Sequence, residues 1–397
     1  MEHIYFDHAA TTPVDGRVLE KMLPYFTDKF GNPNSQHWYG RETVAVVDEA
    51  RDTIAKLIGA KPAEIYFTSG GTEADNWALR GAAHAYKDRG RHLIVSAVEH
   101  PAMIATAKEL IKEGFDVTFA EVDEYGKVDL ERLKKAVRSD TVFIGVMTAN
   151  NEVGTIQPIA EISAFAKERG IVFFTDAVQA AGALPINVKS PAVDMLSFSG
   201  HKFYGPKGIG VLYVRSGLKI GKIITGGHQE RGMRGGTTNV PAIVGMAEAF
   251  RLAQEKLGEN AAYVASLRDR FISRVSKEIP YVKLNGHPTD RLPANANFSF
   301  RYIEGESLLF SLDLAGIAVS SGSACSSGSL EPSHVLLAMG VPEGLAHGSI
   351  RFSFGIHNTP EQVDYAVDKL KEIVVKLRAL SPLFPKDLKN EVFEKEI

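Results

Sequence analysis

Several polar side chains stand just after apolar runs that are typical of buried strands. These residues are His100 after HLIVSAV, Asn151 after TVFIGVMTAN, Asp176 after IVFFT and Lys202 after MLSF. In open α/β sheets, ligands bind at the carboxyl ends of the strands. We therefore expect these four side chains to meet at one edge of a sheet.

Lys202 lies beside His201 in the segment SGHKFYGPKG. A lysine in a dry site next to another cationic group can lose its proton and act as a nucleophilic amine. Most lysines are instead solvated surface groups, and the segment alone favours that alternative. The neighbouring Ser199, His201 and several glycines shift the balance toward a chemical role.

The segment TSGGTEADN follows another strand, EIYF, and runs into a helical pattern. Gly70 and Gly71 let the backbone approach a ligand, and the free N–H groups of a helix N-terminus attract a phosphate. The alternative is an ordinary helix start with Thr72 as the N-cap. Walker-type and G-x-G-x-x-G spacings do not occur here, so the usual nucleotide fingerprints are missing.

Asp176 emerges from so apolar a run that its charge needs a partner. Asp176 either caps the short helix AVQAAG or faces a cationic group of a ligand. His100 is either a solvated loop residue or a flat ring that lies against the same ligand. A phosphate cradle, a lysine and an acid together match pyridoxal phosphate. This cofactor needs a lysine for its covalent attachment and an acid beside its pyridinium nitrogen.

Cys325 is the only cysteine of the chain and lies in AVSSGSACSSGS, residues 318–329. A structural cysteine usually behaves as a small buried hydrophobe, whereas this segment is polar and rich in glycine. A single cysteine excludes an intramolecular disulfide and fits a reducing compartment. The sequence lacks H-E-x-x-H, paired-cysteine and G-x-S-x-G motifs, so it favours neither metal nor serine-triad chemistry.

The rest of the sequence supplies the elements that position these residues. Apolar β-rich runs alternate with helical patterns from residue 40 to about 200. The expected strands are 64–70, 92–98, 116–122, 141–150, 170–177 and 194–200, and the expected helices are 41–59, 72–88, 102–114, 129–137 and 159–170. This alternation predicts a mostly parallel sheet with helices on both faces. The run at 208–214 follows after only a loop, so it pairs antiparallel or is not adjacent.

After residue 258 the pattern changes to that of a smaller α+β domain. A long helical segment over about 241–278 leads to a strand at 295–300. A helix at 304–316, the cysteine segment, a strand at 349–355 and a helix over 360–380 follow. In the last helix, one apolar stripe is formed by Val363, Val367, Leu370, Ile373, Val374 and Leu377.

Length and composition limit the class of protein. The 397 residues suggest about two domains, and 44% hydrophobic residues allow sizeable cores. The formal net charge of −3 argues against a dedicated nucleic-acid binder, which would carry a basic face. The start MEHIYFDHAATTP is not a signal peptide, and no apolar run nears the ~20 residues of a membrane-spanning helix. We expect a cytoplasmic protein that binds neither nucleic acid nor membrane.

Seven motifs with matching spacing identify a family resemblance: GGTEADN, VEHPA, NNEVG, TDAVQAAG, SGHKFYGPKGIG, ERGMRGGT and SSGSAC…IRFSFG. Together with DHAATTP near the start, they resemble the pyridoxal-phosphate cysteine desulfurases of the NifS/IscS type over residues 3–380. The resemblance implies fold type I, the aminotransferase-like α/β fold. It has a large domain with a mostly parallel seven-stranded sheet (residues 15–257), a small α+β domain (1–14 and 258–397) and a homodimeric assembly.

The resemblance also implies a role for each candidate residue that faces the cofactor ring. Lys202 would form the Schiff base, and Asp176 would pair with the pyridine N–H. Gln179 would hydrogen-bond the ring hydroxyl oxygen. His100 would stack on the ring face and act as an acid or base.

The remaining roles concern the phosphate, the substrate and the sulfur. Gly71, Thr72, Ser199 and His201 would hold the phosphate, and Thr237 would reach the phosphate in the neighbouring subunit, so that each active site is shared. Arg351 would clamp the substrate carboxylate as a bidentate fork, with Asn151 beside it. Cys325 resembles the catalytic cysteine, and no metal is implied.

The reaction implied by the resemblance converts L-cysteine to L-alanine and leaves the sulfur on Cys325 as a persulfide. The sulfur then passes to an iron–sulfur scaffold or another acceptor protein. The serines and glycines of 320–329 predict a mobile loop that carries it there. The alternatives are a selenocysteine lyase, an aminotransferase of the same fold, which gives Cys325 no function, and a non-enzymatic carrier.

Overall fold

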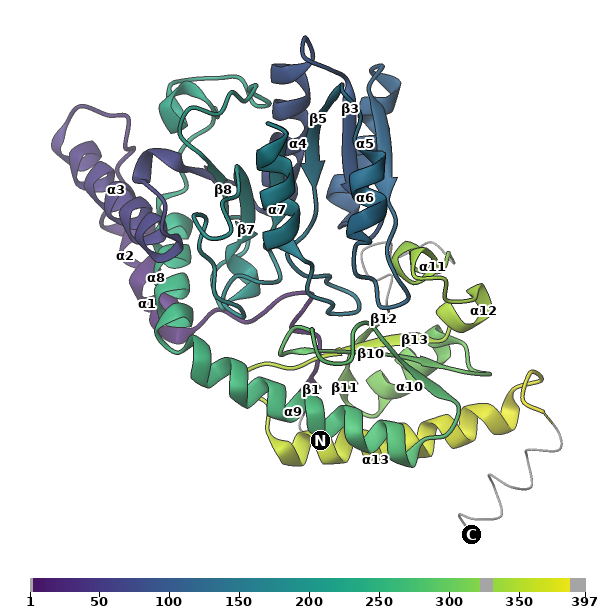
Figure 1. Ribbon diagram of the computed structural model, residues 1–397. Helices are drawn as coiled ribbons and strands as arrows, with labels where there is room; N and C mark the ends of the chain where they lie inside the picture. The colour runs from purple at the N-terminus through teal and green to yellow at the C-terminus, as the bar shows by residue number, and fades with distance from the viewer. Residues whose placement is uncertain (1–2, 322–330, 386–397) are drawn as a thin grey trace.

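The computed structural model describes residues 3–321 and 331–385 of the chain. Figure 1 shows a large α/β body and, below it, a smaller body underlain by the long helices α9 (Leu257–Glu278) and α13 (Pro360–Leu380). Each body has its own sheet and its own apolar core.

The large body is built on a seven-stranded sheet. In spatial order its strands are β2 (Ile65–Thr68), β8 (Gly210–Val214), β7 (Met195–Ser199), β6 (Val172–Asp176), β5 (Thr141–Gly145), β3 (His92–Ser96) and β4 (Asp116–Ala120). Strand β8 is antiparallel to both of its neighbours, and the other neighbouring strands pair in parallel. The predictions of a mostly parallel sheet and of an antiparallel run at 208–214 are therefore confirmed.

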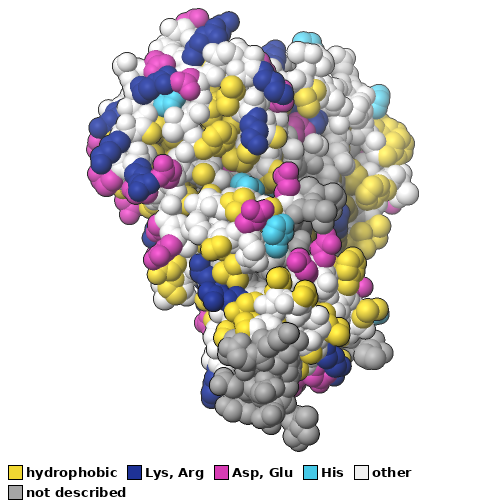
Figure 2. Space-filling model, turned by 90° about the vertical axis from the view of Figure 1, so that its right-hand side faces the viewer, with side chains coloured by type: hydrophobic (Ala, Val, Ile, Leu, Met, Phe, Trp, Pro, Cys, Tyr) yellow, Lys and Arg dark blue, Asp and Glu magenta, His cyan; other side chains and the backbone are white. Residues whose placement is uncertain are grey.

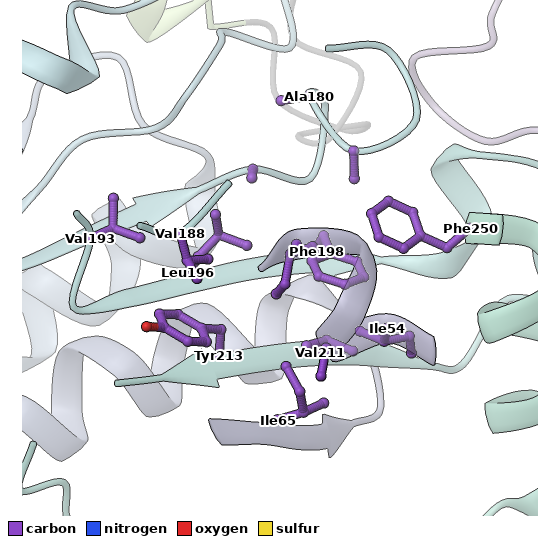
Figure 3. Close-up of a cluster of buried hydrophobic side chains, with 14 of the residues drawn as sticks. Ile54, Ile65, Ala180, Val188, Val193, Leu196, Phe198, Val211, Tyr213 and Phe250 are labelled. Carbon is purple, nitrogen blue, oxygen red and sulfur yellow. The ribbon is translucent and has the colours of Figure 1, made fainter. Parts of the chain in front are cut away.

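Helices cover both faces of this sheet, which is why its inner strands are buried along their whole length. One face packs against α1 (Gly16–Met22), α3 (Trp38–Ile58), α6 (Leu130–Ala136), α7 (Ile159–Glu168) and α8 (Val240–Glu255); the other packs against α4 (Gly71–Tyr86) and α5 (Pro101–Lys112). Figure 3 shows part of the first core, where the rings of Phe250 from α8 and Phe198 from β7 stack with centroids 5.1 Å apart.

The small body contains a four-stranded antiparallel sheet. Its strands, in spatial order, are β12 (Ser320–Ser321), β13 (Ser349–Ser353), β10 (Asn295–Phe300) and β9 (Val282–Asn285). The helices α9, α13 and α10 (Gly305–Leu314) complete its core. The predicted stripe of α13 faces this core, because Val363, Val367, Leu370 and Val374 are buried in it.

The remaining elements are short. The N-terminal strand β1 (Ile4–Tyr5) pairs in parallel with β11 (Ile317–Ala318) of the small body. The other short elements are the α-helices α2 (Pro24–Thr27), α11 (His334–Ala338) and α12 (Glu343–Ala346) and the 3₁₀ helices η1 (Pro62–Glu64), η2 (Gly200–Lys202) and η3 (Gln229–Gly232).

The prediction of one long helical segment over about 241–278 is only partly right, because the structure has two helices with a break between them. The break is at Lys256, whose φ of −115° and ψ of 19° leave the helical range. Helix α8 buries Phe250 in the large core, whereas α9 buries Phe271 in the small core. The break lets consecutive helices serve two different cores.

The surface is mixed in charge on the face shown in Figure 2, where basic and acidic side chains lie next to one another. Within residues 3–321 and 331–385, no helix is both long enough and apolar enough to span a bilayer. In the same part of the chain, no three His, Cys, Asp or Glu side chains gather in a way that would hold a metal ion.

Candidate active site

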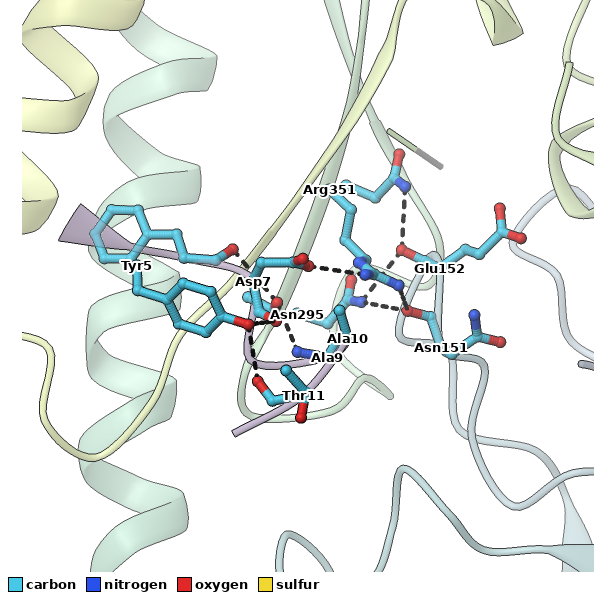
Figure 4. A network of polar contacts seen from close by, with 12 residues as sticks. Tyr5, Asp7, Ala9, Ala10, Thr11, Asn151, Glu152, Asn295 and Arg351 are labelled. Carbon is cyan, nitrogen blue, oxygen red and sulfur yellow. Dashed lines mark hydrogen bonds and ion pairs between the residues drawn. The ribbon is translucent and has the colours of Figure 1, made fainter. Parts of the chain in front are cut away.

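The N-terminal segment from Tyr5 to Thr12 passes between the two bodies and connects several of the predicted site residues (Figure 4). Lys202 Nζ donates to the carbonyls of Ala9 and of Ala10, the latter at 2.8 Å. Gln179 Nε2 also donates to the Ala9 carbonyl at 3.0 Å. Lys202 and Gln179, which come from different loops, therefore converge on one peptide segment.

Lys202 is held at the end of β7 by the short helix η2. The backbone N–H of Gly205 donates to the carbonyl of Gly200, which closes the turn around the lysine. A Cβ at Gly200 would lie 3.0 Å from the Pro206 carbonyl oxygen, so a larger residue would push this turn open. The half-buried lysine is thus directed toward the N-terminal segment.

The predicted phosphate cradle lies where β2 leads into α4. The helix begins at Gly71, and its N-cap is Gly70, which makes no side-chain cap bond, so the alternative with Thr72 as N-cap is wrong. A Cβ at Gly71 would lie 2.8 Å from Val178 Cγ2 and 3.8 Å from Ser199 Cβ, so only glycine leaves this approach open. The first N–H groups of the 16-residue helix α4 form an anion site beside Ser199.

His201 contacts the N-terminal segment, whereas Thr72 is exposed at the start of α4. His201 Nδ1 is 3.1 Å from the Thr11 hydroxyl oxygen, and Thr72 is exposed on the first turn of α4. Burial, together with the charge of Lys202, lowers the pKa of His201 to about 4. His201 is therefore neutral near pH 7 and offers hydrogen bonds rather than a charge.

Asp176 ends β6 as a buried carboxylate that is only 4% exposed. Its Oδ1 accepts from the Val178 backbone N–H at 2.7 Å. The bond holds a turn, because the predicted short helix AVQAAG is not a helix in the structure. Burial raises the pKa of Asp176 to about 6, while the Val178 bond and the charge of Lys202 act in the opposite direction. One backbone hydrogen bond does not offset this burial, so a cationic ligand group beside Asp176 would stabilise its charge.

A second buried acid lies close to Asp176. Ser197 is the register partner of Asp176 on β7, and its hydroxyl donates to Asp75 Oδ1 at 2.6 Å. Burial and the charge of Asp176 raise the pKa of Asp75 well above its usual value. Burial and the charge of Asp176 thus both disfavour a second negative charge at Asp75.

His100 is not the solvated loop residue that the sequence left open as an alternative. It is the N-cap of α5, and its Nδ1 accepts from the Ala102 backbone N–H at 3.1 Å. Burial lowers the pKa of His100 to about 4, and the nearby charges of Lys202 and His334 act in the same direction. The imidazole is therefore neutral at pH 7, as suits a flat ring that stacks on a ligand.

Glu99, the residue before His100, is fully buried. Its Oε1 accepts from the Met147 N–H at 2.6 Å and from the Ser96 hydroxyl at 2.9 Å. Burial raises the pKa of Glu99 to about 8, and the charge of Asp176 adds to this effect. The folded protein therefore holds a proton on Glu99 at pH 7 that the unfolded chain would release.

Replacing Glu99 by glutamine should alter how stability depends on pH. Because the folded-state pKa is raised, the stability contributed by Glu99 is complete below about pH 4.5 and is lost as the pH rises through about 8. Glutamine does not titrate, so the melting temperature of Glu99→Gln relative to the wild type should rise by about 4 °C between pH 5 and pH 8.5. Thermal denaturation across this range measures it.

The exposed Glu124 offers a matched control for this experiment. Glu124→Gln should follow the wild type at every pH. A constant difference between Glu99→Gln and the wild type from pH 5 to pH 8.5 would show that Glu99 carries no proton in the folded state.

Arg351 comes from β13 and reaches the same region from the small body. Its side chain is 3% exposed, and its Nη1 donates to the backbone carbonyl of Asn151 at 3.0 Å. Its Nη2 donates to Asp7 Oδ1 at 2.9 Å. Among the described residues, the buried Nε has no hydrogen-bond partner. The guanidinium thus has donor capacity left for a ligand carboxylate.

Thr237 is exposed. It borders a hollow of about 170 Å³ together with Ser69, Gly208 and Gln229. Cys325 and residues 322–329 of the predicted mobile loop lie outside the described residues, whereas Ser320 and Ser321 of that loop form strand β12. Ser320 pairs with Arg351 between β12 and β13.

Sequence reasoning overlooked three features of this site. It gave no role to Asp7, which contacts Arg351, or to Glu99, and it could not foresee that backbone carbonyls would hold Lys202. The signal for Glu99 was a charged residue at the end of the apolar run HLIVSAV. Asp7 stands at the start of the motif DHAATTP, whose polar residues suggested no chemistry of their own.

The chain belongs to the aminotransferase class-V family, whose sequence model matches residues 4–366. Enzymes of this family depend on pyridoxal phosphate. The chain is 54% identical over 379 residues to a cysteine desulfurase IscS of Dictyoglomus turgidum, with 96% of each chain covered. It is 52% identical to a cysteine desulfurase IscS of Methanosarcina thermophila, with 98% of this chain and 96% of that one covered.

The fold has close counterparts among solved structures. A NifS-like protein superposes with a TM-score of 0.89 at 42% identity, covering 94% of this chain and 100% of the other. A NifS-like protein from Rickettsia africae gives a TM-score of 0.85 at 33% identity, covering 94% and 99% of the two chains. Both likenesses extend over the large and the small body.

The described residues fit pyridoxal phosphate on structural grounds. Gly71 has no side chain, so a phosphate could come close to the backbone there, and the buried Asp176 suits the cationic ring nitrogen. Lys202 supplies the amine that the cofactor needs. These groups sit on neighbouring loops at the carboxyl ends of β2, β6 and β7.

Proposed function

We propose that this protein is a cysteine desulfurase that converts L-cysteine to L-alanine and takes the sulfur onto Cys325 as a persulfide. One observation carries the proposal. Lys202 and Arg351 both bind the short segment Asp7–Ala10, the lysine through two carbonyls and the arginine through the Asp7 carboxylate. An amino acid held by its carboxylate at Arg351 would therefore be presented toward the amine of Lys202.

The residues at the sheet edge would hold the cofactor. Lys202 would bind it covalently, with Asp176 at the ring nitrogen, Gln179 at the ring hydroxyl oxygen and His100 against the ring face. The phosphate would be held by Gly71, Thr72, Ser199 and His201. When bound, the cofactor supplies an electron sink for the pair released at the substrate α-carbon.

Each side chain of the site would then carry out a different step of the reaction. Arg351, with Asn151 beside it, fixes the substrate carboxylate, and Lys202 removes the proton from Cα. The thiolate of Cys325 attacks the substrate sulfur, so that an S–S bond forms as the C–S bond breaks. The electron pair of the broken bond remains on the alanine carbon, which takes up a proton. Because the attacking species is a thiolate, the site must lower the free-cysteine pKa of about 8.5 or couple proton transfer to the attack.

We further propose a homodimer with shared active sites, in which Thr237 reaches the phosphate bound by the neighbouring subunit. The exposure of Thr237 supports this arrangement. Large apolar side chains on α1 to α3 and their connections are also exposed, as expected of a surface that another chain covers: Leu19, Leu23, Phe26, Phe30 and Trp38.

The proposed division of the chain is a large cofactor-binding domain over 15–257 and a small domain over 1–14 and 258–397. The separate apolar cores of the two bodies support it. The single cysteine is consistent with a reducing compartment, and we place the protein in the cytoplasm on that basis. Its sulfur would pass to an iron–sulfur scaffold or another acceptor protein.

One experiment tests the reaction class. The purified protein, loaded with pyridoxal phosphate, is incubated with L-cysteine and a reductant, and sulfide and alanine are measured together. A desulfurase should release the two in equal amounts. Sulfide without alanine would contradict the proposal, and a strong preference for selenocysteine in parallel assays would favour a selenocysteine lyase.

A further inference from the structure

Asp7 places a carboxylate directly on the arginine that we assign to the substrate. Figure 4 shows the Asp7 side chain beside the guanidinium of Arg351, with Asn151 on the other side. The Nη2–Oδ1 distance is 2.9 Å, and the two side chains are 3% and 18% exposed. This ion pair is therefore largely shielded from water. Two charges attract each other more strongly in such a buried site than they do in water.

The backbone around Asp7 is tied down on both sides. Asp7 forms a parallel β-bridge with Ser353 of β13, and the Ser353 hydroxyl accepts from the Ala9 backbone N–H at 2.8 Å. The Tyr5 hydroxyl lies 3.0 Å from the carbonyl of Asp7 and 3.0 Å from that of Thr11. The carboxylate thus comes from a fixed segment, and its position relative to β13 is set by the fold.

Arg351 needs a resident counter-ion because an uncompensated buried charge is costly. Asp7 is the one carboxylate that forms an ion pair with Arg351 among the residues that the structure describes. Glu152 lies near enough to feel its charge, but burial raises the pKa of Glu152 to about 7, and its carboxylate accepts from Ser333. Glu152 is therefore partly protonated near neutrality and is directed elsewhere.

We propose that Asp7 is a positioning residue of the carboxylate clamp: it orients the guanidinium of Arg351 and lowers the clamp's affinity for the α-carboxylate of an amino acid. The inference rests on the proposed function, because it takes Arg351 as the substrate-binding arginine. The substrate carboxylate must share a charge that Asp7 already balances. The product amino acid carries the same carboxylate, so the lower affinity of the clamp favours release of the product.

The test measures binding of L-alanine to the pyridoxal-phosphate-loaded enzyme by titration calorimetry. Asp7→Asn keeps an oxygen acceptor for Nη2 but removes the competing charge, so the Kd for L-alanine should fall about fivefold. Asp7→Glu keeps the charge but displaces the carboxylate by one methylene, so the Kd should rise about fivefold. Asp364→Asn removes a half-buried carboxylate that pairs with Arg270 and Arg274 and should leave the Kd unchanged.

A Kd that falls in Asp7→Asn and rises in Asp7→Glu distinguishes this positioning role from a purely structural one. General damage to the structure around Asp7 would raise the Kd in both variants. An unchanged or higher Kd in a folded Asp7→Asn protein would overturn the inference. If that variant does not fold, an unchanged or lower Kd in Asp7→Glu would overturn it instead. Arg351→Met tests the proposed function separately, since unaltered alanine binding in this variant would remove Arg351 from the substrate site.

Discussion

Replacing Lys202 by alanine should reduce the release of sulfide and alanine from L-cysteine by a factor of about 10³ or more. In the proposed mechanism, Lys202 supplies both the amine that attaches the cofactor and the base that removes the Cα proton, and losing either group costs orders of magnitude in rate. The fold should survive, because the lysine is only half-buried and contacts two backbone carbonyls of the N-terminal segment. Activity assays combined with a melting curve measure both effects.

Lys207 is the natural control for this experiment, since it lies five residues further along the same glycine-rich segment and is exposed. Lys207→Ala should retain cofactor absorption and turnover near wild-type levels. Visible absorption of a covalently attached cofactor in Lys202→Ala, or turnover within tenfold of the wild type, would show that another amine serves as the nucleophile.

Replacing Cys325 by serine should abolish persulfide formation while leaving cofactor binding intact. The groups that fit the cofactor, Lys202, Asp176 and the Gly71 approach, lie on the large sheet and remain in place. A hydroxyl is a far poorer nucleophile than a thiolate at neutral pH, so alanine formation from cysteine should fall by about 10³ or more. Mass spectrometry of the intact protein after a single turnover detects the added sulfur atom.

The added sulfur atom can be assigned to Cys325 because the chain has no other cysteine. Ser326→Ala, at the next position in the sequence, should still acquire the sulfur atom. An aminotransferase would keep working without Cys325. Undiminished amino-group transfer to an oxoacid by Cys325→Ser, with no sulfur chemistry in the wild type, would therefore favour that alternative.

Much of the candidate site could be predicted because strand ends are visible in the sequence. Asp176 and Lys202 each follow a run that is rich in apolar residues, and the topology of a parallel sheet brings such ends to one edge. Local patterns also predicted the direction of β8 relative to β7. These features depend on periodicity within a few residues, which a single sequence displays directly.

Other features depend on contacts that no local pattern encodes. The ion pair between Asp7 and Arg351 joins residues 344 positions apart. The start of α4 at Gly71 also differs from the Thr72 capping alternative, because close packing of Gly71 against Val178 overrides the usual preference for a hydroxyl at the cap. The break at Lys256 follows from the position of two separate cores rather than from helix propensity.

The pairing of β1 with β11 has a consequence for how the enzyme is made. Ile4 can pair only after Ile317 has been synthesised, and Asp7 only after Ser353, so this early segment stays without these partners while more than 300 residues are added. Contacts of such long separation slow folding, whereas the large sheet can begin to form from elements closer in sequence. The N-terminal segment can consequently link Lys202 to Arg351 only after the small body has been synthesised. A nascent chain would thus lack a finished cysteine-handling centre until its last elements have folded.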